Sequence, residues 1–215
     1  MEKRFLIPLA CGIALSLLIL SGLSCVSCVI HYGSSAPHAL PMTESEFESY
    51  IMPECPLVKE ALQNIFGGSV YELTKAGFDD IRDWVAASID YKSDQQQWGG
   101  DYWQTPEETL SYRTGDCEDF AILLCSILRA YGIDAEQMYV VLGVNDEEYR
   151  HAFLNENWYL DGEWRSIESQ AYTQLSSWYS WFWRPTAHPD SELDEYEIIV
   201  AFNDIYYHDE SFPWN

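Results

Sequence analysis

Basic residues are scarce in this chain. Among its 215 residues, 11 are Lys or Arg and 35 are Asp or Glu, which gives a formal net charge of -24 at pH 7. This balance argues against binding nucleic acid or anionic lipid headgroups through a general basic surface. The acidic excess says little about the substrate, because a strongly acidic face is usually just a solvated one.

Repeats and low-complexity blocks are also absent, which excludes a solenoid or a fibrous chain. The stretch NDEEY (residues 145–149) offers oxygen atoms to calcium but has no EF-hand-like spacing, so we predict no metal and no cofactor. Aromatic residues, in contrast, make up 15% of the chain, more than a disordered chain carries. A packed globular body is therefore expected.

A long hydrophobic run occupies the N-terminus. Two basic residues precede an apolar stretch from Phe5 to Leu20, and small residues follow ahead of Cys25. This pattern is typical of a secretory signal, and residues 21–25 (SGLSC) resemble the lipobox at which bacterial lipoproteins are cleaved and lipidated on the cysteine. The competing interpretation is one transmembrane helix over residues 5–30. Both predict an extracytoplasmic domain anchored to the cell membrane by lipid or by an N-terminal helix.

The rest of the chain divides into a tether and one domain. Residues 1–24 are the signal peptide or anchor, residues 25–56 form a tether rich in Pro, Ser and Glu, and residues 57–215 form the domain. Hydrophobic spacing predicts helices over residues 57–66, 78–91 and 117–131, with a further helical turn starting at Pro106. Strands are then predicted over residues 138–144, 151–160, 163–168 and 197–202. Helices followed by consecutive strands favour an α+β fold with an antiparallel sheet.

Cys117 lies in an unusual setting for a reactive thiol. Asp116 precedes it and Glu118 and Asp119 follow it, and such neighbours hold a thiol protonated. With Asp116 as N-cap, however, Cys117 is the first helical residue and Asp119 can return a hydrogen bond as in a capping box. The positive helix end can stabilise a thiolate or a developing oxyanion. Cys117 is therefore a candidate nucleophile that needs a base from elsewhere.

The candidate base is His151, because it opens a predicted strand of the domain. An imidazole on a sheet that faces a cysteine at a helix start can withdraw the thiol proton. A third group should hold the imidazole, and Glu168 on the next strand is the candidate. The other histidines lie beside the leader, in the tether or in the acidic C-terminal part: His31, His38, His188 and His208.

Three stretches resemble the transglutaminase-like fold of papain-type cysteine enzymes: GDCEDFAILLCSILRAYGI (residues 115–133), HAF (151–153) and GEWRSIES (162–169). The resemblance covers about Phe78 to Glu168. It implies a nucleophile helix packed on an antiparallel sheet, with Cys117 as nucleophile, His151 as general base and acid, and Glu168 as the orienting carboxylate. The family usually has Asp in the third place, so Glu168 is a methylene longer.

The resemblance also suggests the surroundings of the nucleophile. By analogy with the papain-type glutamine, Gln104 is the candidate oxyanion donor beside the Cys117 backbone N–H, and Trp103 is expected to line the same cleft.

Strand register offers a test of the role of Glu168. A two-residue turn at Asp161–Gly162 would place Glu168 opposite Asn155, four residues from His151, and at roughly 3.3 Å per residue that is too far for a hydrogen bond. A wider loop that pairs Glu156 with Glu163 places Glu168 opposite His151. We predict the wide loop, with Asn155 as the fallback orienting group.

The implied activity is that of a cysteine peptidase or amidase, or of an acyl transferase, working through a thioester on a peptide or protein amide. The alternative is an inactive transglutaminase-like domain that binds peptide or glycan at the cell surface. For that alternative, the aromatic stretch SSWYSWFWRP (residues 176–185) is the candidate stacking platform, although packing against the sheet or over the cleft is the simpler interpretation. The oligomeric state is not predicted.

The cysteine count leaves one disulfide open. The body of the chain holds Cys55, Cys117 and Cys125, an odd number, in a compartment that permits disulfides. Cys125 lies among Leu and Ile and is expected to be a small buried hydrophobic residue. A Cys55–Cys125 bridge is compatible with the sequence, which does not determine it.

Overall fold

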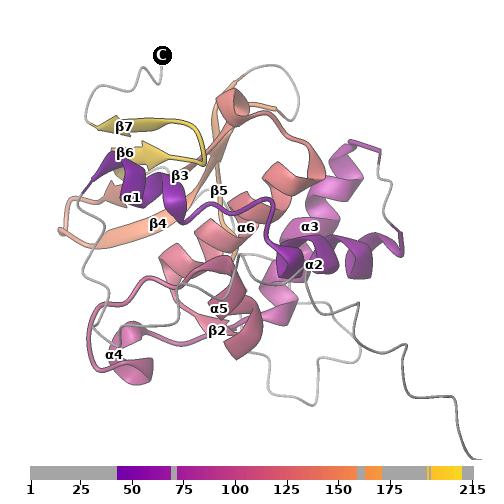
Figure 1. Cartoon of the computed structure of the whole chain (residues 1–215). Helices are drawn as coiled ribbons and strands as arrows, with labels where there is room; N and C mark the ends of the chain where they lie inside the picture. Colours follow the sequence, from indigo (N-terminus) through magenta and orange to yellow (C-terminus); the bar gives the residue numbers. More distant parts are fainter. Residues whose placement is uncertain (1–42, 69–71, 159–162, 171–192, 194, 210–215) are drawn as a thin grey trace, which may run out of the picture. The chain divides into compact units, whose positions relative to one another are not determined.

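The computed structural model describes residues 43–68, 72–158, 163–170, 193 and 195–209 (Figure 1). All of these belong to one unit, Pro37–Asn215. The predictions on residues 1–24, on Cys25 and on residues 176–185 lie outside the described residues. Within the described ranges, no helix is both long enough and apolar enough to cross a membrane.

Helices dominate the first part of the unit and strands the second. The helices are α1 (Glu44–Ser49), α2 (Pro56–Phe66), α3 (Lys75–Ser88), α4 (Asp94–Gln97), α5 (Pro106–Tyr112) and α6 (Cys117–Tyr131), followed by the 3₁₀ turn η2 (Ala135–Gln137). The strands are β1 (Asp90–Tyr91), β2 (Thr114–Gly115), β3 (Met138–Val144), β4 (Arg150–Glu156), β5 (Arg165–Ile167), β6 (Glu197–Phe202) and β7 (Tyr207–Asp209). The helices at Pro106 and Cys117 begin at the predicted residues, and β3 and β6 have the predicted bounds.

The main sheet is antiparallel, with strand order β5-β4-β3-β6-β7. A separate two-residue parallel ladder joins β1 to β2 immediately before α6. These observations confirm the predicted α+β class with an antiparallel sheet. Strand β7 was not predicted, because three residues are too few to show a hydrophobic period.

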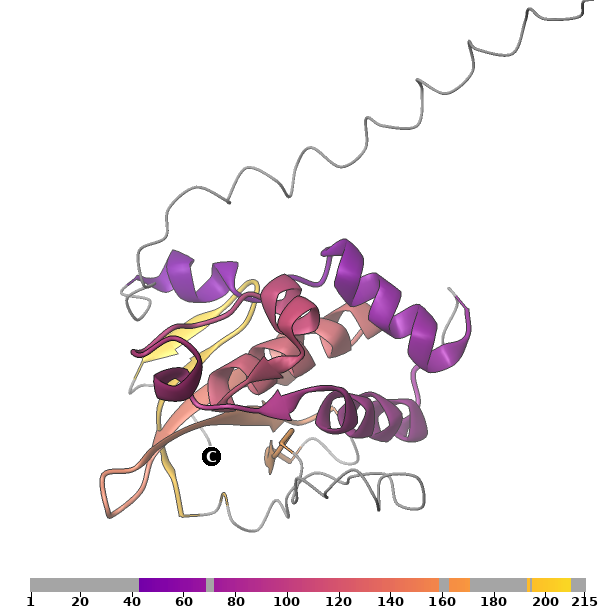
Figure 2. The ribbon, with the colours of Figure 1, turned by 90° about the horizontal axis from the view of Figure 1, so that it is seen from below.

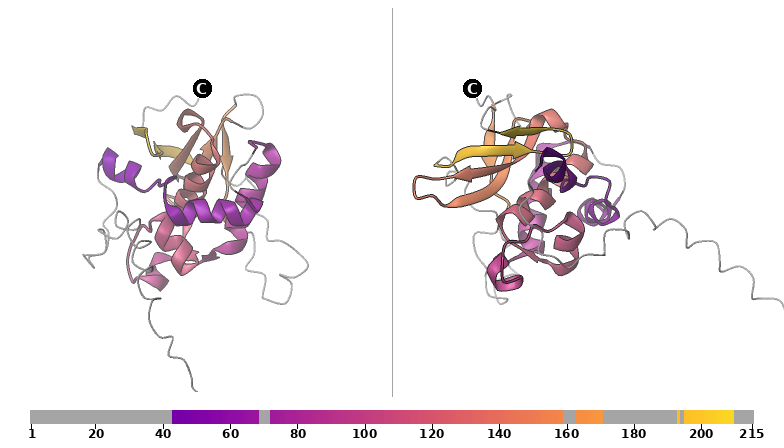
Figure 3. Two further views of the ribbon diagram at one scale, coloured as in Figure 1. Left: turned by 45° about the vertical axis from the view of Figure 1, so that its right-hand side comes forward. Right: turned by 60° about the vertical axis from the view of Figure 1, so that its left-hand side comes forward.

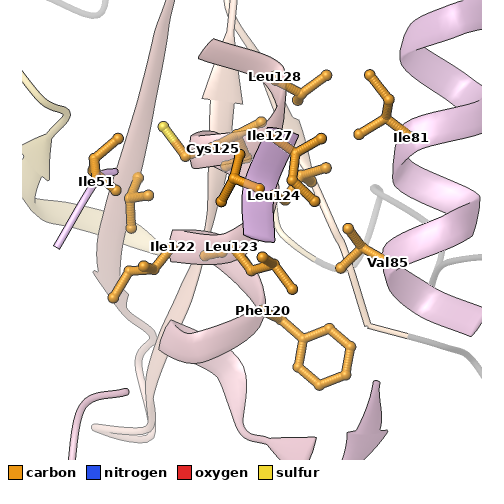
Figure 4. Packing of buried hydrophobic residues seen from close by; sticks show 14 of the residues in the cluster. Ile51, Ile81, Val85, Phe120, Ile122, Leu123, Leu124, Cys125, Ile127 and Leu128 are labelled. Carbon is orange, nitrogen blue, oxygen red and sulfur yellow. The ribbon is translucent and has the colours of Figure 1, made fainter. Parts of the chain in front are cut away.

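Helix α6 is the central element of the fold. It contacts α2, α3 and α5 on one side and strands β3 and β4 on the other (Figures 2 and 3). A helix covered on all sides is apolar all round. Figure 4 shows Leu123 and Ile127 directed towards Ile81 and Val85 of α3, while Cys125 points to the opposite side. The helix ends at Gly132, whose φ of 117° suits glycine at a C-cap. A buried helix of this kind fixes Cys117, at its first position, against the sheet.

The last part of the predicted tether joins the folded body. Residues 44–49 form α1, which starts with a capping box between Thr43 and Glu46. Phe47 is buried, and its ring lies 5.0 Å from that of Phe202 on β6. The packed body therefore begins before residue 57.

Candidate active site

Cys117 is held at the start of α6 by local contacts that the sequence predicted. Asp116 is the extended N-cap residue, and its backbone N–H donates to Asp119 Oδ2 at 3.2 Å, as in a capping box. The preceding Gly115 lies so close to Asp119 that an added Cβ would come within 2.6 Å of the Asp119 Cβ. The acids beside the cysteine thus have a structural role in the helix start.

The Cys117 thiol is protonated at rest. Its Sγ donates to Glu118 Oε2 at 3.2 Å. Burial, followed by the charges of Glu118 and Asp116, raises the pKa of the thiol well above its ordinary value. The backbone N–H of Ala152 opposes this rise by donating to the sulfur. Because Ala152 directly follows His151, this contact places the sulfur beside the part of β4 that carries the imidazole.

His151 and Glu168 are in contact, as predicted. The His151 Nε2 lies 2.6 Å from Glu168 Oε2, and the Glu168 side chain is 5% exposed. Glu168 Oε1 also accepts hydrogen bonds from the backbone N–H groups of Ser169 and Gln170. Burial alone would raise the pKa of Glu168, but the hydrogen bond and charge of His151 and the two backbone donors lower it below its ordinary value. An ionised Glu168 makes Nε2 the N–H donor, which leaves Nδ1 to accept a proton.

The register that brings these two residues together is not the predicted one. Strand β5 pairs Ile167 with Leu154 and Arg165 with Glu156, so Glu156 does not face Glu163. The ladder ends at Ile167, and its extension would place Glu168 opposite Phe153. Phe153 is two residues from His151 on the same face, and a long side chain can reach such a diagonal neighbour. The fallback orienting group, Asn155, pairs with Ser166 further along the strand.

Arg82 and Tyr196, from other parts of the chain, contact Glu168 and His151 respectively. Arg82 on α3 donates from Nε to the Glu168 backbone oxygen at 2.6 Å. The Tyr196 ring lies 5.5 Å from the His151 ring, and Phe153 lies 5.8 Å from it on the same strand. Gly143 makes room for Tyr196, because an added Cβ would come within 2.8 Å of the Tyr196 Cβ. No sequence pattern indicated either contact, because both join segments far apart in the chain.

Gln104 has a different position from the predicted one. Its side-chain amide donates to the Thr114 backbone oxygen at 3.0 Å and to Asp119 Oδ2, and its backbone N–H donates to Asp119 Oδ1 at 2.8 Å. Both amide N–H groups are therefore occupied in anchoring the start of α6. The prediction of Gln104 as oxyanion donor is corrected on this ground.

Trp103 is a core residue instead of a cleft residue. It is 3% exposed, and its ring packs against Phe47 at 5.7 Å, Tyr50 at 5.6 Å and Phe202 at 6.2 Å. The aromatic residues of α1 and β6 surround it because the segment taken as a tether folds onto the domain. The predicted cleft role of Trp103 is corrected accordingly.

Carboxylates gather around the start of α6. The acidic oxygens of Asp94, Asp116 and Asp119 lie within 4.8 Å of one another, and so do those of Asp94, Asp101 and Glu118. Burial is the main cause that raises the pKa of Asp94 to about 6 and of Asp119 to about 8, and it also raises the pKa of Glu118. Such a group of buried like charges is costly without a compensating cation.

One oxygen in this group has no hydrogen-bond donor. Asp116 Oδ2 accepts from the Asp94 backbone N–H at 3.0 Å. Asp116 Oδ1 is buried and accepts no hydrogen bond from the residues that the structure describes. Carboxylate oxygens are the ligands that calcium prefers, so the donor set fits a hard divalent cation.

Cys55 and Cys125 are both buried and are not joined by a disulfide. The bridge that the sequence left open is therefore not formed in this structure. Cys125 is 0% exposed, as expected for a small hydrophobic residue within α6.

Comparison with known proteins bears out this fold. A family model described as the transglutaminase-like superfamily matches residues 62–169, a range that includes Cys117, His151 and Glu168. The chain belongs to the transglutaminase-like superfamily. No curated protein matches the chain.

Proteins of similar fold are also found among solved structures. LapG from Legionella pneumophila is 18% identical, with a TM-score of 0.52 over 81% of this chain and 92% of that one. Its calcium-bound form is 17% identical, with a TM-score of 0.50 over 80% and 83%. Its EGTA-treated form is 18% identical, with a TM-score of 0.51 over 81% of this chain and 89% of that one. At these identities the likeness concerns the fold.

Proposed function

We propose that this transglutaminase-like domain is a cysteine hydrolase or acyl transferase acting on peptide or protein amides. Cys117 is the nucleophile, His151 the general base and acid, and Glu168 the group that orients the imidazole. The observation that carries the proposal is the 2.6 Å contact from His151 Nε2 to Glu168 Oε2, on the strand whose Ala152 N–H meets the Cys117 sulfur.

The reaction begins from a neutral thiol, because burial and the neighbouring acids raise the pKa of Cys117. The S–H proton passes to His151 Nδ1 as the sulfur bonds to the substrate carbonyl carbon, which creates a tetrahedral oxyanion. The C–N bond then breaks, and the imidazolium gives its proton to the leaving amine. The product on the enzyme is a thioester.

The second half returns the enzyme to its starting state. Water or an acceptor amine attacks the thioester carbon while His151 takes the proton of the attacking group. The C–S bond breaks, the sulfur recovers a proton from His151, and a carboxylic acid or a new amide leaves. Glu168 stays ionised throughout and stabilises the imidazolium.

A direct test uses p-nitrophenyl acetate as an artificial acyl donor. We expect a burst of p-nitrophenolate, stoichiometric with protein, followed by slow turnover, because acylation of Cys117 precedes hydrolysis. Cys117→Ala should lose the burst, while Cys55→Ala should keep it, because Cys55 is buried away from reagents. A burst that survives Cys117→Ala would refute the proposal and leave a binding module as the better interpretation of the fold.

We also propose that the domain lies outside the cytoplasm, anchored to the membrane. The basic and apolar residues of the N-terminal segment support export, with residues 1–24 as signal peptide or membrane anchor and Cys25 as the lipidation site. The domain would then meet its substrates outside the cytoplasm, at the membrane surface. Because the chain carries a formal charge of -24, we propose no nucleic-acid partner.

The carboxylates at the start of α6 support a cation in place of the predicted absence of metal. LapG is known in a calcium-bound form. In this chain, Asp94 and Asp116 would hold a calcium ion through hard carboxylate oxygens, beside the second group of Asp101 and Glu118 that shares Asp94, and Asp116 Oδ1 accepts no hydrogen bond from the described residues. A bound calcium ion supplies positive charge that relieves the repulsion among these acids.

Calcium is expected to stabilise the folded protein. At a concentration about 100 times its Kd, a ligand of the folded state adds about 2.7 kcal/mol, which raises the Tm of a domain of this size by about 5–10 °C. Differential scanning calorimetry with calcium and then with EGTA measures the shift and its reversal. Asp116→Asn should lose the shift, whereas Asp79→Asn should keep it, because Asp79 is a half-buried acid of α3 paired with Lys75. A shift that is absent in wild type, or equal in Asp116→Asn, would exclude this site.

A further inference from the structure

The proposed reaction needs the Glu168 carboxylate at a fixed place beside His151. Glu168 follows Ile167, the last residue of β5 that pairs with β4, so the ladder ends one residue before it. Its side chain accepts hydrogen bonds from the backbone N–H groups of the next two residues, Ser169 and Gln170. These bonds fix the carboxylate relative to its own turn only. The turn itself needs an anchor in another element.

Arg82 on α3 provides such an anchor. Its Nε donates a hydrogen bond to the Glu168 backbone oxygen at 2.6 Å. A hydrogen bond from a charged donor is among the stronger ones in proteins. Because this bond goes to the backbone of Glu168, both carboxylate oxygens remain available to His151 and to the two backbone donors. The contact therefore holds the position of the acid and leaves its chemistry unchanged.

Helix α3 is itself fixed against the elements that carry the other two groups. Ile81 and Val85 are buried, and Figure 4 shows them facing α6, the helix that starts at Cys117. Phe78, also on α3, stacks on Trp158 just after β4, with ring centroids 6.2 Å apart. A donor on this helix thus ties the acid both to the helix of the nucleophile and to the strand of the base.

We propose that Arg82 is a positioning residue that holds the Glu168 backbone, and with it the carboxylate, at hydrogen-bond distance from His151. Its effect on the reaction passes through Glu168, because a misplaced carboxylate no longer orients the imidazole. A misplacement of about 1 Å can slow an enzyme reaction by about 10²-fold. This inference rests on the proposed function and names the group that keeps the orienting acid in place.

Two substitutions of equal length test this role. In Arg82→Met a methyl group takes the place of the Nε–H donor, whereas in Arg82→Gln the side-chain amide nitrogen takes it. Both variants lose the guanidinium and its charge. We expect acylation by p-nitrophenyl acetate to slow by about 10- to 10²-fold in Arg82→Met, and to stay close to the wild-type rate in Arg82→Gln.

The matched control is Arg113→Met. The Arg113 guanidinium also contacts α3, where it lies 5.8 Å from the centre of the Trp84 ring. Its loss should leave the acylation rate unchanged. All rates are compared in variants that remain folded by circular dichroism. Should Arg82→Met not fold, Arg82→Leu, which also lacks a donor, takes its place.

A double-mutant cycle with Glu168→Gln separates positioning from a role in the fold. Arg82→Met should slow acylation in the wild-type background but add almost nothing in Glu168→Gln, because the carboxylate it would misplace is already gone. Equal slowing in both backgrounds, or equal slowing by Arg82→Met and Arg82→Gln, would assign Arg82 to the fold and refute the inference. A wild-type rate in Arg82→Met would refute it as well.

Failure of the proposed function has a different signature. It would show in the wild-type protein, as acylation that depends on neither Cys117 nor His151, and the role of Arg82 would then fail with it. If wild-type acylation depends on both residues while the Arg82 variants behave in one of the contrary ways above, the inference about Arg82 fails alone.

Discussion

Replacing His151 with Ala should slow alkylation of Cys117 by iodoacetamide near neutral pH by about 10²- to 10⁴-fold, the usual contribution of a positioned general base. The size of the effect follows from the resting state of the thiol. Burial and the charges of Glu118 and Asp116 raise the pKa of Cys117 well above its ordinary value, so little thiolate forms without a base. The measurement is the pseudo-first-order rate of carboxamidomethylation of the Cys117 peptide.

The matched control for this variant is His208→Ala. His208 lies on β7, at the edge of the same sheet that carries His151 on β4. Loss of that imidazole should leave the alkylation rate unchanged. A His151→Ala variant that alkylates as fast as wild type, while remaining folded by circular dichroism, would remove His151 from the mechanism.

Replacing Glu168 with Gln should lower the rate of acylation by p-nitrophenyl acetate by about 10²- to 10⁴-fold. The glutamine amide can donate an N–H to His151 Nε2, which favours the tautomer that carries its proton on Nδ1. That tautomer cannot accept the thiol proton at Nδ1. The variant also loses the negative charge that stabilises the imidazolium, which in wild type lies 2.6 Å from His151 Nε2, at Glu168 Oε2.

Glu168→Asp tests the unusual length of this side chain. Aspartate keeps the charge but is one methylene shorter, so we expect a rate between those of wild type and Glu168→Gln. Glu156→Gln is the control, because Glu156 is a buried carboxylate in the same sheet. It should change stability more than the acylation rate. Equal rates for wild type and Glu168→Gln would show that the contact has no part in orienting the base.

Much of the fold was readable in local patterns. Helix α6 was predicted from its N-cap acid to Gly132 because capping and apolar spacing both act within a few residues. Strands β3 and β6 are long and β-branched and were predicted at their true bounds. The helix within the presumed tether was missed, because α1 has only 6 residues and depends on tertiary packing of Phe47.

The candidate site was readable only in part. The contact between His151 and Glu168 was predicted, but through a register that does not occur, since sequence does not show that the chain leaves the ladder after Ile167. Gln104 was misassigned because its partner, Asp119, lies 15 residues away in the chain. The hydrogen bond from the Asp94 N–H to Asp116 was missed, because Asp94 is positioned by the nearby pairing of β1 with β2, and no local pattern encodes that pairing.

The acids around Cys117 have an explanation in this arrangement. Asp119 caps the helix start and anchors Gln104, and Asp116 accepts the Asp94 N–H. These acids therefore fix the start of the helix that carries Cys117. Their charges also keep the thiol protonated, so that it depends on a base from another element. A thiol of this type stays protonated until base and substrate reach the sulfur together.

Acylation of Cys117 with the help of His151 can be observed by peptide mapping, using mass spectrometry of protein quenched in acid during the reaction with p-nitrophenyl acetate. We expect an acetyl group on Cys117, removable by hydroxylamine, that accumulates in wild type and forms far more slowly in His151→Ala. No acetyl group should appear on Cys55 or Cys125. Acetylation confined to lysines would rule out Cys117 as the nucleophile, and a Cys117 thioester that forms at the same rate without His151 would rule out His151 as its base.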